Sequence, residues 1–70
     1  MNNVLYLNKE IYNKSNLQIA IRDYSNITKI EVKEVHGYYS CTFRDCKFDA
    51  GITILEFENY LIGITRKNDY

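Results

Sequence analysis

The chain has 70 residues, and nine basic side chains balance nine acidic ones without a long block of either sign. We expect a single small domain spanning residues 1–70, and no nucleic-acid partner, because the clustered positive charge typical of nucleic-acid binding is missing. No stretch approaches the roughly 20 apolar residues of a transmembrane helix, and the N-terminus does not read as a signal peptide, so we expect a cytoplasmic protein without a membrane partner.

The first two elements are a strand and a helix. Val4–Leu7 is short, apolar and aromatic and is bounded by asparagines, which favours a strand. Ser15 is then predicted to cap a helix. The apolar side of this helix is formed by Leu17, Ala20, Ile21 and Tyr24. Ile19 lies off that side, where it either contacts a partner or stays partly exposed.

Residues 28–44 are rich in β-branched and aromatic side chains and predict a hairpin that turns at His36-Gly37. The facing pairs are then Val35 with Tyr38, Glu34 with Tyr39, Val32 with Cys41, and Ile30 with Phe43. Strand alternation places Ile30, Val32, Tyr39, Cys41 and Phe43 on one apolar face. Cys46 and Phe48 fall out of phase with this face, so we expect a bulge or turn near Asp45.

A second helix is predicted near the C-terminus. Thr53 followed by Glu56 matches a capping box, which predicts that the helix begins at Thr53. One face carries apolar residues at spacings of three and four, namely Ile54, Phe57, Leu61 and Ile64. Because an apolar helix face needs a surface to cover, we expect this face to pack on the sheet.

These elements predict an α+β fold, a two-layer βαββα sandwich with a three-stranded sheet and two helices on one face. The second strand alternates lysine and glutamate along Lys29–Glu34, which is typical of a protected edge strand. We therefore expect the third strand at the centre of the sheet and the first strand at the other edge.

The residues that carry chemistry are few, and we expect no catalytic residue, no metal and no cofactor. His36 is the single histidine and is predicted to be a turn residue. Cys41 falls on the apolar face, whereas Cys46 is the more accessible thiol, and we favour a structural role for both. Glu56 and Glu58 lie two positions apart on a helix, so their carboxylates point in different directions.

The chain contains seven tyrosines. Tyr24 is predicted to lie in the core. For Tyr38, Tyr39 and Tyr60 the sequence leaves two alternatives open, a recognition surface or the completion of a small core.

Four segments together resemble HxsD-like proteins, small bacterial proteins named for the His-Xaa-Ser system. They are Ile11-Tyr12, Ala20–Tyr24, Tyr39–Phe43 and Thr53–Ile62, of which Glu56–Ile62 is the most specific. The resemblance implies a non-catalytic accessory role in radical SAM maturation of a ribosomally made peptide, with the precursor peptide or the maturase as partner. The chain lacks the three clustered cysteines of a radical SAM enzyme.

A mechanism for such a role is the addition of an extended peptide to an exposed strand edge. The first strand suggests itself as that edge because its residues, Val4, Leu5, Tyr6 and Leu7, carry no protecting charge. Homodimerisation through the same edge is the rival interpretation. A second function class is a protein-binding regulator, antitoxin-like or inhibitor-like, that acts by occlusion. An enzyme is the weakest class, since we expect a core this small to enclose no cavity of ligand size.

Overall fold

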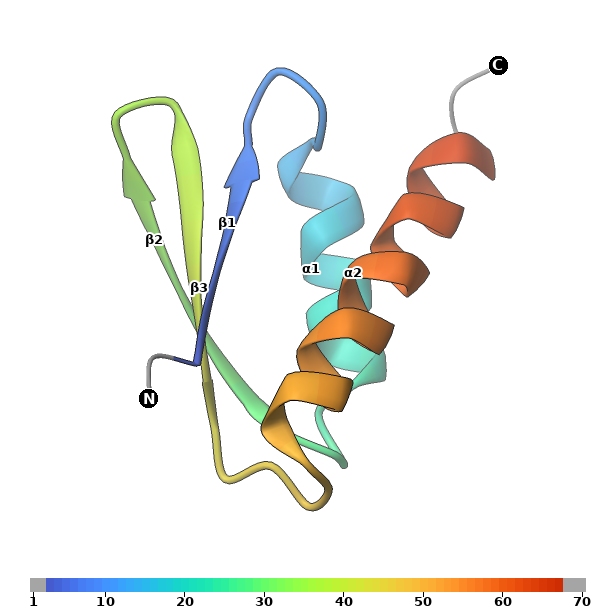
Figure 1. Cartoon of the computed structure of the whole chain (residues 1–70). Coiled ribbons are helices and arrows are strands. Elements are labelled where there is room, and N and C mark those ends of the chain that lie inside the picture. Colours follow the sequence, from blue (N-terminus) through green and yellow to red (C-terminus); the bar gives the residue numbers. More distant parts are fainter. Residues whose placement is uncertain (1–2, 68–70) are drawn as a thin grey trace.

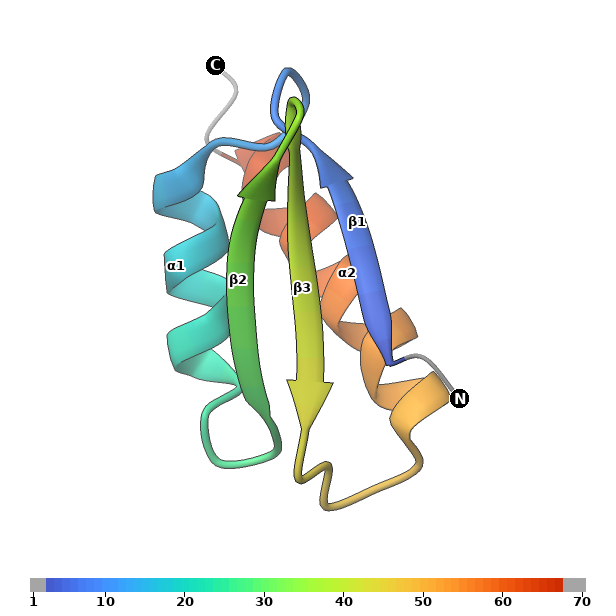
Figure 2. The same cartoon turned by 90° about the vertical axis from the view of Figure 1, so that its left-hand side faces the viewer.

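Two helices cover one face of a three-stranded antiparallel sheet in the computed structural model, which describes residues 3–67 (Figures 1 and 2). The elements in chain order are β1 (Val4–Asn8), α1 (Lys14–Asp23), β2 (Lys29–Val35), β3 (Tyr38–Arg44) and α2 (Ala50–Lys67). Strand β3 lies between β1 and β2, which form the two edges. The predicted α+β fold, its element order and its strand order are confirmed.

The β2–β3 hairpin has the predicted register. Val35 faces Tyr38 and Ile30 faces Phe43, with His36 and Gly37 as the two turn residues. Both turn residues have positive φ angles, 45° for His36 and 84° for Gly37, as a turn that matches the twist of the strands requires. This register places Cys41 and Phe43 in the core and directs alternate side chains to the opposite face.

The core is centred on Phe57 of α2. Its ring packs edge-on against Phe43 of β3, with centroids 5.2 Å apart, and against Tyr24 after α1, with centroids 5.3 Å apart. The predicted apolar sides of both helices are confirmed, since Leu17 and Leu61 are fully buried in the same cluster. The full buried cluster comprises Leu7, Leu17, Ala20, Tyr39, Cys41, Phe43, Phe57 and Leu61.

The helix caps differ from the predicted ones. In α1 the cap is Asn13, whose Oδ1 accepts a hydrogen bond from the Asn16 N–H at 2.8 Å, and Ser15 lies inside the first turn. Asparagine is as good a cap as serine, so local preference alone does not separate two candidates this close in sequence.

Helix α2 begins at Ala50 rather than at Thr53. Asp49 caps it, since its Oδ2 accepts from the Ile52 N–H at 3.0 Å. Thr53 is buried one turn into the helix and donates its hydroxyl to the Asp49 carbonyl at 2.9 Å. The predicted capping box is therefore wrong, because Thr53 belongs to the buried side of the helix.

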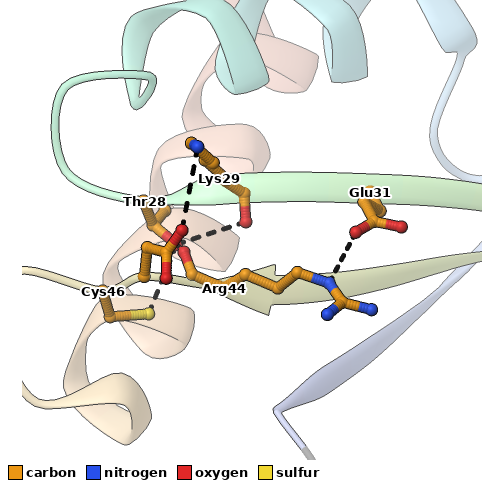
Figure 3. Close-up of polar contacts among 6 residues, drawn as sticks. Thr28, Lys29, Glu31, Arg44 and Cys46 are labelled. Atoms are coloured by element: carbon orange, nitrogen blue, oxygen red, sulfur yellow. Dashed lines mark hydrogen bonds and ion pairs between the residues drawn. The ribbon is translucent and has the colours of Figure 1, made fainter.

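The connection from β3 to α2 contains the predicted turn at Asp45, whose φ angle is 52°. Beside it, the buried Thr28 donates its hydroxyl to the Arg44 carbonyl at 2.9 Å, and the Cys46 Sγ lies 3.3 Å from the Thr28 Oγ1 (Figure 3). Cys46 thereby packs against the core as the phase argument expected. Phe48 does not, and its ring is exposed.

The assignment of the α2 cap predicts the effect of two matched substitutions. Asp49→Ala removes the acceptor of the first-turn N–H and should lower the free energy of unfolding by about 1 kcal/mol. Glu56→Ala, which would break a capping box, should change it by less than about 0.5 kcal/mol. Urea denaturation of both variants measures the difference. A larger loss for Glu56→Ala would return the helix start to Thr53.

Candidate functional site

The four residues predicted as a binding edge lie on β1, and the structure divides them between two faces. Leu5 and Leu7 point toward the helices, with Leu7 fully buried, whereas Tyr6 is exposed on the opposite face. The Phe43 N–H donates to the Asn3 carbonyl at 2.8 Å, so the odd-numbered residues of β1 direct their backbone groups toward β3. Val4 and Tyr6 are left to direct theirs to the outer edge.

The end of the β1 edge is closed by the following loop. The Asn8 carbonyl accepts hydrogen bonds from the N–H groups of Ile11 and Tyr12, at 3.1 and 3.0 Å. This edge therefore offers both backbone groups of only two residues within the described strand, Val4 and Tyr6. A short edge of this kind gives a peptide few pairing positions.

The second edge, on β2, is longer. Because the odd residues of β3 turn toward β1, Ser40 and Thr42 turn toward β2, where they face Lys33 and Glu31. Alternation then directs the backbone N–H and C=O groups of three β2 residues to the outer edge, and the side chains of the same three toward the helices. These residues are Ile30, Val32 and Glu34.

A surface groove of about 410 Å³ runs between this edge and α1. Its lining residues are Lys14, Leu17, Gln18, Ile21, Ile30, Val32, Glu34 and Tyr39. The groove exists because α2 occupies the centre of the sheet and α1 lies beside it, near β2 (Figure 2). Val32 is 37% exposed although it projects from the covered face of the sheet. We expected no ligand-sized cavity in so small a core; the groove meets that size because it is open at the surface.

One end of the groove is charged. The Glu34 Oε1 lies 2.5 Å from the Lys9 Nζ, and the Glu34 Oε2 lies 3.7 Å from the Lys14 Nζ. The Lys9 ammonium also lies 5.3 Å from the centre of the Tyr39 ring. The hydrogen bond from Lys9, and then the charges of Lys9 and Lys14, lower the pKa of the Glu34 carboxyl. A groove with apolar walls and one charged end distinguishes ligands by polarity along its length.

The candidates for reactivity lie apart from the groove, as their predicted structural roles imply. His36 is exposed in the turn, and Cys41 is fully buried, where desolvation raises the pKa of its thiol to about 11. A thiol with a raised pKa is a poor nucleophile at neutral pH. Within residues 3–67 no three metal-ligating side chains gather around a common point.

The structure settles the alternatives left open for the tyrosines. Tyr39 is buried and closes the floor of the groove, whereas Tyr38 is exposed on the opposite sheet face. Tyr60 is exposed and donates its hydroxyl to the Asp23 Oδ2 at 2.5 Å, which links α2 to α1. Only Tyr39 of these three therefore contributes to the groove.

Comparison with known protein families, curated proteins and solved structures finds no match for this chain. The resemblance to HxsD-like proteins therefore rests on the sequence segments given above. Neither helix in the described part of the chain is long and apolar enough to cross a membrane.

The charged end of the groove predicts a pH effect. Because the pKa of Glu34 is lower in the folded state than in the unfolded state, its ionised form stabilises the fold at neutral pH, and this stabilisation is lost as the pH falls through the folded-state value. Lys9→Met should raise the pKa of Glu34 toward its ordinary value, as measured by NMR titration of the carboxyl carbon. Lys47→Met is the control and should leave it unchanged. An unaltered Glu34 pKa in Lys9→Met would contradict the assigned ion pair.

Proposed function

We propose that the protein is a non-catalytic binding module that takes up an extended peptide segment along the β2 edge. The observation that carries this proposal is the coincidence of two features on one side of the molecule. Three residues of β2 direct backbone groups outward, and the same three residues line an apolar groove against α1. Backbone pairing supplies affinity in such an arrangement, and the groove supplies selectivity.

The pattern of side chains that the site accepts follows from strand geometry. A peptide paired with β2 alternates its side chains between the two faces of the extended sheet. Every second side chain then enters the groove between Ile21 and Val32, and apolar residues suit that position. A polar or charged side chain suits the end formed by Lys14 and Glu34.

The β1 edge predicted from the sequence is the competing location. Val4 and Tyr6 offer backbone groups there, but the groove lies at the other edge of the sheet. An edge without an adjoining groove provides pairing without side-chain selection. The observations therefore favour β2 over β1.

The resemblance to HxsD-like proteins supports a more specific role. In that reading the extended segment belongs to the precursor peptide or to the radical SAM maturase, and the protein assists peptide maturation without taking part in the chemistry. The alternative role is an antitoxin-like or inhibitor-like regulator that occludes a target through the same edge. Both roles use the β2 edge and differ in the partner.

Two proline substitutions separate the two edges. Val32→Pro removes an outward N–H of β2, and Tyr6→Pro removes the equivalent group of β1; neither group takes part in the pairing with β3. Each tagged variant and the wild type are expressed in the native host, and the bound proteins and peptides are identified by mass spectrometry. Circular dichroism confirms that both variants remain folded.

We expect the wild type and Tyr6→Pro to recover the same partner and Val32→Pro to lose it. Loss in Tyr6→Pro alone would assign binding to the β1 edge. A partner kept equally by both variants would refute edge pairing altogether. Recovery of a radical SAM protein or its precursor peptide supports the accessory role, whereas recovery of an unrelated single target supports the occluding regulator.

A further inference from the structure

The outer side of α2 carries large apolar side chains that the core does not use. Phe48, just before the helix, is 67% exposed, and Ile52 and Leu55 are 57% and 58% exposed. Ile62 continues the same side two turns further along. Single exposed apolar residues need no explanation, but a row of them along one helix marks a surface for association.

The spacing of this row is that of a helix–helix seam. Its members, separated by four, three, four, three and four positions, are Phe48, Ile52, Leu55, Asn59, Ile62 and Arg66. This row lies opposite the buried side of α2, formed by Thr53, Phe57 and Leu61. Alternating spacings of three and four keep a seam facing one partner helix, and a single asparagine in such a seam is a known device for fixing the register.

The charges along α2 indicate which partner fits the seam. Asp49, Glu56 and Glu58 lie at its start and in its first half, whereas Arg66 and Lys67 lie in its last turn. Two copies of this helix placed antiparallel bring the acidic part of each toward the basic end of the other, and they also oppose their helix dipoles favourably. The surface is thus complementary to itself under a twofold axis, as a symmetric dimer requires.

We propose that the outer side of α2, from Phe48 to Arg66, binds the same surface of a second copy of this chain, with the two helices antiparallel. The interface lies on a different side of the molecule from the groove, which α1 and β2 form. A dimer assembled in this way leaves both β2 edges accessible. The proposal does not depend on the peptide-binding role.

Sedimentation equilibrium over a wide concentration range tests the interface. Leu55→Glu places a charge at the middle of the seam, and because Leu55 is already exposed in the monomer, the fold should survive. We expect this substitution to weaken the dimer by about 30-fold or more, the effect of a central interface residue. Ile11→Glu is the matched control, since Ile11 is equally exposed but lies in the loop before α1.

The orientation of the helices is tested by pulsed electron paramagnetic resonance with a nitroxide label on Arg66→Cys, in a Cys46→Ala background. Antiparallel helices separate the two labelled positions by more than about 20 Å along the axis, whereas parallel helices bring them to about 10 Å. A wild type that stays monomeric at all concentrations would overturn the proposal. So would a dimer that Leu55→Glu leaves intact, in particular one that Tyr6→Pro dissociates, because such a dimer forms through the β1 edge. A short label distance would overturn the antiparallel arrangement.

Discussion

The packing of Phe57 between Phe43 and Tyr24 is the constraint on which the rest of the structure depends. Its ring contacts the central strand of the sheet on one side and the end of α1 on the other, with centroid distances of 5.2 and 5.3 Å. One side chain thereby joins the sheet and both helices. This contact sets α2 over the middle of the sheet and leaves α1 beside it, so the inner face of β2 is incompletely covered and the groove forms there. The candidate binding site is a consequence of how the core is filled.

Chain length explains why apolar surface is left over. A domain of about 60 to 70 residues buries only about 60% of the surface that its unfolded chain exposes, and its stability is correspondingly small. Here the remainder is concentrated in two places, the groove beside β2 and the outer side of α2. Concentrated apolar surface favours association with a partner, while scattered apolar residues do not. Both proposals above assign such a surface a partner of defined geometry.

The sequence predicted those features that repeat locally. The His36-Gly37 turn and the alternation beyond it determine the hairpin register, and the spacing around Phe57 determines the buried side of α2. The cap of α2 was missed because Thr53 satisfies the local pattern while belonging to the buried side. The groove depends on the sideways position of α1 relative to β2, which no local pattern encodes. The seam that contains Leu55 was present in the spacing, but the buried stripe had already accounted for the helix.

Amide hydrogen exchange along β2, measured by NMR on the free protein at low concentration, tests the central claim most directly. If β2 is an open edge, the N–H groups of Glu31 and Lys33 are protected by pairing with β3, and those of Val32 and Glu34 exchange rapidly. The account predicts this alternation, and it predicts that rapid exchange at Val32 slows when a partner peptide binds. Uniform protection along β2 in the free protein would contradict the account, because it would mean that the edge is already covered.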